Sequence, residues 1–261
     1  MRNKLLPLIV LFFLFTIYSG VSAVDNILNT PDETAISITF SYNAPIPFRI
    51  YLPLCYRSGM RLPVLYLLHG QGQSEHLWEE LGIIRLLDEM ISSGEIQPMI
   101  VVMPRETYYY QNMDESEYPE SVVNELIPTI DNAFPTIADR NARAIGGISR
   151  GALWAQKIAF ENLDMFIALG NHSLPNPFFS DYMINKYLKE HQDLSPLNIY
   201  IDTGNKDPYA KGSSDFSKQL FQFYLSHTLN VSPGTHDNDY WSEHLKEYLL
   251  WYDSVLRTTE K

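Results

Sequence analysis

The sequence predicts an α/β domain with a mostly parallel central sheet and helices on both faces. Short, continuous apolar runs of the kind found in strands buried on both faces occur at residues 63–68, 98–103, 143–146, 166–169 and 197–201. Helical patterns alternate with these runs, at about residues 78–92, 118–134, 152–161 and 213–227, and an amphipathic stretch over 240–256 closes the chain. Because strand alternates with helix, the connections are predicted to be crossovers between parallel strands.

The segment before these runs has a different pattern. Residues 35–42 alternate between polar and apolar side chains, as a half-buried strand does, and residues 47–53 give a second such segment. Together they predict antiparallel strands at the N-terminal side of the sheet. The chain of 261 residues contains no repeat or linker that would divide it, so we expect one domain.

The first 23 residues resemble a secretory signal peptide. Arg2 and Lys4 form a basic start, residues 5–18 are almost entirely apolar, and Val21-Ser22-Ala23 supplies the small residues of a cleavage site. We therefore expect export, secreted or periplasmic, with the folded domain over residues 24–261; the alternative is an uncleaved N-terminal anchor. Nothing later in the sequence is long and apolar enough to cross a membrane.

The net charge argues against several classes of partner, and the cysteine count excludes a disulfide within the chain. The formal net charge is −12, and removal of Arg2 and Lys4 leaves 17 basic against 31 acidic residues, near −14. Such a surface repels phosphate backbones and anionic lipid, so we expect neither a nucleic acid nor a stable membrane partner. A neutral or weakly charged small molecule suits it better. Cys55 is the single cysteine, so no disulfide forms within the chain.

Gly147-Ile148-Ser149-Arg150-Gly151 matches the G-x-S-x-G motif of a nucleophile elbow. The motif places a serine in a strained turn between a strand and a helix, where bulky neighbours would clash with backbone. An apolar strand pattern precedes the motif here and a helical pattern follows it. Ser149 is therefore the predicted nucleophile. The alternative is that the segment is only a glycine-rich turn whose serine caps the following helix.

A serine nucleophile needs a histidine base and a carboxylate that orients it, in the chain order Ser, Asp or Glu, His. His236 is the favoured base because it lies in a loop just before the last helical pattern, and His244, inside that pattern, is the rival. Asp207 is the favoured acid because it lies in the loop after the strand at 197–201. Asp202 is the rival, still on the strand or at its edge.

The carboxyl ends of the other strands supply the remaining candidates, because ligands bind there in such sheets. Backbone N–H groups of Arg150 and of Gln71 are the predicted donors of an oxyanion hole. Tyr108 and Tyr109 are candidates for an aromatic wall beside a substrate, and His172 and Ser173 for the lining of the pocket. His69, before Gly70, is expected to order its loop rather than to act as a base.

These motifs together resemble those of one family. The resemblance also includes Leu62–Gly70, Trp78, residues 101–104, and Gly234-Thr235-His236-Asp237 with Trp241. The family is the putative-esterase family of α/β-hydrolases, which includes esterase D, enterochelin esterases, feruloyl esterases and the antigen 85 mycolyltransferases. The resemblance covers about residues 36–252 and implies the α/β-hydrolase fold, the triad Ser149, Asp207 and His236, the oxyanion pair Gln71 and Arg150, and no metal or cofactor. Many members have Met-Gly-Gly after the serine, where this chain has Arg150-Gly151-Ala152.

The resemblance implies a serine carboxylic-ester hydrolase acting on a small or carbohydrate-linked ester. Two other functions remain open from the sequence: acyl transfer to a sugar alcohol, and a non-catalytic binding module on a hydrolase scaffold. The sequence does not predict an oligomeric state.

Overall fold

The structure, a computed structural model, describes residues 46–57, 59–107 and 110–256. The predicted signal peptide and the predicted strand at 35–42 lie outside the described residues. The described strands form one sheet, in the order β1-β3-β2-β4-β5-β6-β7. The strands are β1 (Phe48–Tyr51), β2 (Val64–Leu68), β3 (Ile100–Pro104), β4 (Arg143–Ile148), β5 (Ala168–His172), β6 (Asn198–Gly204) and β7 (His227–Ser232).

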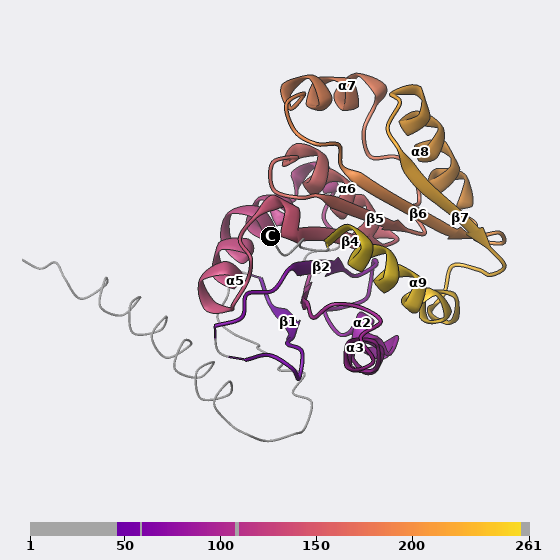
Figure 1. The fold of residues 1–261 in the computed structure, drawn as a ribbon. Helices are drawn as coiled ribbons and strands as arrows, with labels where there is room; N and C mark the ends of the chain where they lie inside the picture. The colour runs from indigo at the N-terminus through magenta and orange to yellow at the C-terminus, as the bar shows by residue number, and fades with distance from the viewer. Residues whose placement is uncertain (1–45, 58, 108–109, 257–261) are drawn as a thin grey trace, which may run out of the picture.

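Strands β2 to β7 are parallel to one another, and β1 pairs antiparallel with β3. The predicted mostly parallel sheet is therefore confirmed, as is an antiparallel strand at its N-terminal edge. Helices cover both faces (Figure 1). They are α2 (Leu77–Glu80), α3 (Ile83–Ser92), α4 (Tyr118–Ser121), α5 (Ile127–Ala133), α6 (Arg150–Glu161), α7 (Asp181–Glu190), α8 (Ala210–Gln222) and α9 (Asn238–Leu256), with 3₁₀ turns at Met113–Glu115 and Arg140–Ala142.

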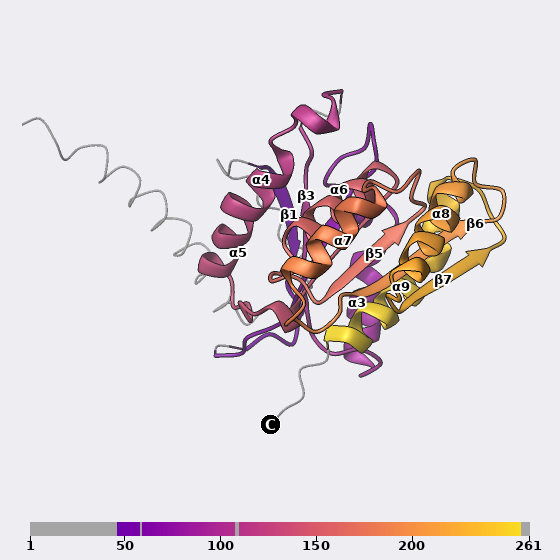
Figure 2. The same ribbon diagram turned by 90° about the horizontal axis from the view of Figure 1, so that it is seen from above.

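The core has two apolar layers, because side chains of a strand point alternately to opposite faces. In β2, Tyr66 and Leu68 belong to the layer beneath α5 to α8, whereas Leu65 and Leu67 belong to the layer beneath α3 and α9. Seen from above, α5, α6 and α8 lie over successive parts of the sheet, and α7 overlaps α6 (Figure 2). Burial on both faces explains why the strands are continuously apolar.

Two predicted helices are interrupted at places that the apolar pattern alone does not show. The predicted helix 78–92 is two helices, because Gly82 adopts a positive φ of 94° between α2 and α3. The predicted helix 118–134 contains a π-helical turn at Val122–Leu126 before α5. Pro128 in the first turn of α5 explains this, because it lacks the N–H that an α-helical bond requires.

The predicted helix 213–227 begins earlier, at Ala210, and ends at Gln222. Tyr224 takes a left-handed conformation (φ 57°), and the N–H of Leu225 bonds back to the carbonyl of Leu220 at 3.0 Å. This is the Schellman termination that glycine usually provides, so its sequence signal is weak. His227 consequently begins β7. Helix α7 was not predicted; its visible signal is Ser180, whose side chain caps the N–H of Met183.

The turn from β4 into α6 is packed directly against the end of β2. A Cβ at Gly151 would lie 2.5 Å from the carbonyl oxygen of Leu68 and 2.6 Å from that of His69. A Cβ at Gly147 would lie 2.4 Å from the backbone of Gly151. The two glycines of the motif are therefore required by backbone contact.

In the part of the chain that the structure describes, no helix combines the length and apolar character needed to cross a bilayer.

We predict that Gly151→Ala lowers the free energy of unfolding by about 1–3 kcal/mol, because the new methyl group overlaps two backbone oxygens that cannot move independently of β2. Urea denaturation followed by circular dichroism measures this. Ser92→Ala, on an exposed face of α3, is the control and should change stability by less than about 0.5 kcal/mol. Equal stabilities for the two variants would contradict the argument.

Candidate active site

Ser149 lies between β4 and α6 in a backbone conformation that L-residues rarely adopt, with φ 55° and ψ −117°. Its N–H donates to the carbonyl of His172 in the neighbouring strand, at 2.9 Å. Its Oγ lies 3.0 Å from Nε2 of His236, so the hydroxyl donates to the ring. The strained turn thus points the hydroxyl out of the sheet and toward a base.

His236 comes from the loop between β7 and α9, as expected for a base carried by the last loop of the sheet. Its Nδ1–H donates to Oδ2 of Asp207 at 2.8 Å, which leaves Nε2 as the acceptor from Ser149. The ring stands edge-on between two aromatic rings, with centroid distances of 4.8 Å to Tyr209 and 5.1 Å to Trp241. These contacts fix the orientation of the imidazole.

Asp207 is 5% exposed and lies in the loop after β6. Its Oδ1 accepts the backbone N–H of Tyr209 at 2.7 Å. Burial by itself would raise the pKa of Asp207, but hydrogen bonds from His236, Tyr209 N–H and Ser173, with the charge of His236, outweigh it and hold the pKa below its usual value. The carboxylate therefore stays ionised at neutral and mildly acid pH.

The rivals of these residues have other partners. Asp202 accepts from the hydroxyls of Tyr240 (3.0 Å) and Tyr248 (2.7 Å) and from Nδ1 of His172 (2.6 Å). His244 lies in α9 and donates from Nδ1 to the carbonyl of Tyr240 in its own helix. The structure brings together Ser149, His236 and Asp207, and it holds Asp202 and His244 elsewhere.

His172 and Ser173 differ from the sequence expectation. Both are fully buried, so neither lines a pocket open to a substrate. His172 is held beneath the site by Asp202 and by the hydroxyl of Tyr252 (3.1 Å from Nε2). Ser173, in a left-handed conformation (φ 53°), accepts from the indole N–H of Trp241 at 3.0 Å and hydrogen bonds to Asp207. Ser173 therefore lies behind the carboxylate of Asp207, where α9 covers the end of β5.

The segment that carries Gln71 follows β2, next to the elbow. Leu68 of β2 is in register with Gly147 of β4, so the residues that follow the two strands emerge side by side. Arg150 is the first residue of α6, and its backbone N–H therefore has no partner within the helix. His69 is buried and bonds the loop backbone, consistent with the ordering role expected of it.

Glu106 is a residue that the sequence analysis missed. It is 3% exposed, although a lone glutamate is rarely buried without a partner, and its carboxylate binds the guanidinium of Arg150 at 2.6–3.0 Å. The sequence signal for it is its position alone, two residues after the end of β3. Tyr108 and Tyr109 lie outside the described residues.

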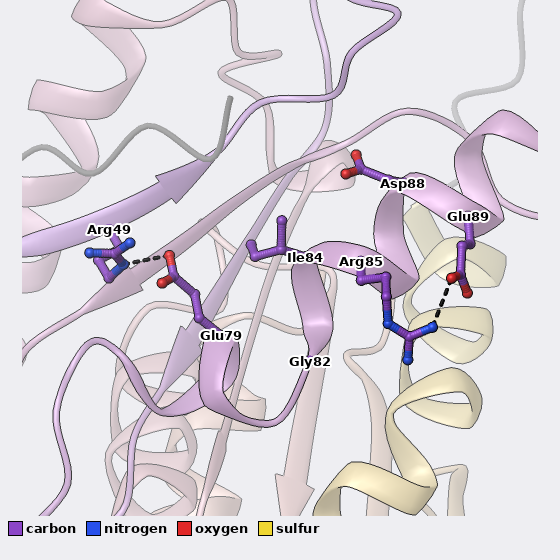
Figure 3. A pocket seen from close by; sticks show the side chains of 7 residues that line it. All are labelled: Arg49, Glu79, Gly82, Ile84, Arg85, Asp88 and Glu89. Carbon is purple, nitrogen blue, oxygen red and sulfur yellow. Dashed lines mark hydrogen bonds and ion pairs between the residues drawn. The ribbon is translucent and has the colours of Figure 1, made fainter. Parts of the chain in front are cut away.

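A separate cavity of about 560 Å³ lies between β1 and the helices α2 and α3 (Figure 3). Its charged side chains are paired: Arg49 with Glu79, Arg85 with Glu89, and Asp88 with the hydroxyl of Tyr51. None of Ser149, His236 and Asp207 lines it. Among the described residues, no group of three or more His, Cys, Asp or Glu side chains is placed to hold a metal ion.

Comparisons with known proteins point to one family. The family model described as "Putative esterase" matches residues 39–252. An endo-1,4-beta-xylanase/feruloyl esterase of Xylanibacter ruminicola is 36% identical over 45% of this chain and 18% of its own length. Endo-1,4-beta-xylanase Y of Acetivibrio thermocellus is 24% identical over 89% of this chain and 24% of its own length. The chain thus spans about a quarter or less of these two relatives.

A solved structure described as a ferulic acid esterase superposes with a TM-score of 0.75, at 23% identity, over 87% of this chain and 100% of that one. This similarity shows that the fold is that of the α/β-hydrolases, as the sequence predicts.

We predict that Asp207→Asn slows labelling of Ser149 by a fluorophosphonate by a factor on the order of 10³–10⁴, because the amide favours the wrong tautomer of His236. Asp202→Asn is the matched control. It should lower thermal stability, because it disturbs a buried carboxylate with three partners, yet leave the labelling rate within about tenfold. Labelling followed by mass spectrometry measures both rates. The reverse ranking would show that Asp202 is the orienting acid.

Proposed function

Since the chain belongs to the "Putative esterase" family of α/β-hydrolases, we propose that it hydrolyses carboxylic esters with a triad of Ser149, His236 and Asp207. The observation that carries the proposal is the continuous pair of hydrogen bonds, 3.0 Å from Ser149 to His236 and 2.8 Å from His236 to Asp207. The three residues are up to 87 positions apart in the sequence, and their convergence requires the whole fold.

In the proposed mechanism, Oγ of Ser149 attacks the ester carbonyl while its proton passes to Nε2 of His236. Asp207 holds the ring in the required tautomer and stabilises the imidazolium that forms. Backbone N–H groups of Arg150 and Gln71 stabilise the tetrahedral oxyanion. His236 then protonates the departing alcohol and leaves an acyl-serine. Water, deprotonated by His236, attacks this acyl group, and the acid departs as the proton returns to Ser149.

The proposed substrates are esters of small acids with carbohydrate or other neutral alcohols. The names of the relatives support this, because they associate this family segment with xylanase and feruloyl esterase proteins. Tyr209 also supports this proposal. It is 46% exposed and its ring contacts that of His236, so it lies where the alcohol part of the substrate would be protonated. Tyr108 and Tyr109 are proposed to add an aromatic wall. The net charge of −12 disfavours anionic substrates.

We also propose that the protein acts outside the cytoplasm, with residues 1–23 removed as a signal peptide. The support is the basic, apolar and small-residue pattern of that segment. N-terminal sequencing of the protein recovered from the secreting host tests it, and Val24 should be the first residue. Retention of Met1 in the exported protein would refute cleavage.

We predict that Ser149→Ala lowers kcat on p-nitrophenyl acetate by at least about 10⁴-fold, because the proposed covalent step requires the hydroxyl of Ser149. Ser180→Ala, a surface helix cap in α7, is the matched serine control and should keep wild-type turnover. Methyl ferulate and acetylated xylan, assayed with the wild-type enzyme and with Ser180→Ala, define the acyl and alcohol preference. Undiminished turnover by folded Ser149→Ala would refute the mechanism, and a transferred acyl group on added xylose, in place of free acid, would indicate acyl transfer.

A further inference from the structure

The arginine that follows the nucleophile is held by a buried carboxylate. Nε and Nη2 of Arg150 both donate to the carboxylate of Glu106, at 2.6–3.0 Å, and Nη2 also donates to the carbonyl of Gln111 at 3.2 Å. The side chains are 12% and 3% exposed. The guanidinium lies 5.3 Å from the ring centre of Trp154, one turn further along α6. Such a two-pronged pair fixes orientation as well as distance.

The same glutamate reaches the loop on the other side of the elbow. The backbone N–H of Glu106 donates to Nε2 of His69 at 2.9 Å, and Nδ1–H of His69 donates to the carbonyl of Gly70 at 2.8 Å. Burial is the largest influence on His69 and lowers its pKa, so the ring is neutral. A neutral ring with a proton on Nδ1 can make both bonds, whereas an imidazolium could not accept from Glu106.

We propose that the Arg150–Glu106 pair is a positioning device for the oxyanion hole, joining the residue after the nucleophile to the loop that carries Gln71. The chain of contacts runs from Arg150 through Glu106 and His69 to Gly70. It links the two backbone segments that the proposed function assigns as oxyanion donors, and the inference rests on that function. Arg150 and Glu106 are positioning residues through their side chains, which do not touch the substrate.

This chain of contacts, the side-chain bridge, is needed because the two proposed oxyanion donors, Arg150 and Gln71, follow different strands. An oxyanion donor acts only when its N–H lies at hydrogen-bonding distance from the oxygen of the tetrahedral state, and loss of one donor costs about 10²–10³ in kcat. Displacement of a donor costs less than its removal. The sheet fixes the strand ends, but Gln71 lies in an exposed turn three residues beyond β2. The side-chain bridge ties that turn to the start of α6.

The test compares Glu106→Gln with Asp131→Asn. Asp131 accepts from Nη2 of Arg143 at 2.7 Å and from the hydroxyl of Thr136 at 2.7 Å, so the control also removes the charge from a half-buried ion pair, at the opposite end of β4 from the elbow. Both variants should lower the unfolding midpoint. Glu106→Gln alone should lower kcat for p-nitrophenyl acetate, by about 10–100-fold, with KM changed less than threefold. Glu106→Asp, which keeps the charge, should recover part of the loss.

A second measurement separates positioning from general loss of structure. Benzeneboronic acid adds to the serine as a tetrahedral mimic of the transition state, so its inhibition constant should rise in Glu106→Gln by about the same factor as kcat/KM falls. Wild-type kcat in folded Glu106→Gln, an equal loss in Asp131→Asn, or unchanged boronic acid affinity would each overturn the inference. No turnover by the wild-type enzyme would instead refute the proposed function.

Discussion

The close contact between the elbow and the end of β2 is the constraint on which the rest of the structure depends. Gly147 and Gly151 have no side chain, so α6 begins within van der Waals distance of the carbonyls of Leu68 and His69. That approach holds Ser149 at a positive φ that would otherwise cost of order 1–3 kcal/mol. It also sets the first turn of α6 beside the turn after β2. The same close packing therefore fixes the position of Ser149 and sets side by side the two segments that are proposed to supply the oxyanion donors.

Sheet register explains why Asp207 hydrogen bonds to His236 and Asp202 does not. His172 and Asp202 are direct partners in the β5–β6 pairing, so their side chains meet within the sheet and beneath α9. Asp207 lies three residues beyond the end of β6, where the chain is free to turn toward the loop of His236. The result is two His–Asp pairs, one buried against the tyrosines of α9 and one beside Ser149. Ser173 and Trp241 connect the second pair to the buried layer.

Local signals were sufficient for the parts that local packing determines. The apolar runs predicted β2 to β6 because strands buried on both faces have no polar side to interrupt them. The motif and chain order singled out Ser149, His236 and Asp207, which the structure brings into hydrogen-bonding contact. The end of α8 was missed because Tyr224, rather than glycine, takes the left-handed conformation there. The burial of His172 and the role of Glu106 depend on partners 30 and 44 positions away, which no local pattern encodes.

Arginine after the nucleophile need not make the site cationic. Its guanidinium is paired with the carboxylate of Glu106 through Nε and Nη2, and Nη2 also donates to the carbonyl of Gln111. The imidazole of His236 is similarly matched to Asp207 before any substrate arrives. In the proposed mechanism, negative charge at the carbonyl is stabilised by backbone N–H groups at the start of α6 and after β2. Such dipoles attract a developing oxyanion strongly only at contact distance and exert little pull on a distant anion. Under the proposed mechanism, a site of this kind in a chain of net charge −12 would favour the transition state of a neutral ester over the binding of an anionic ground state.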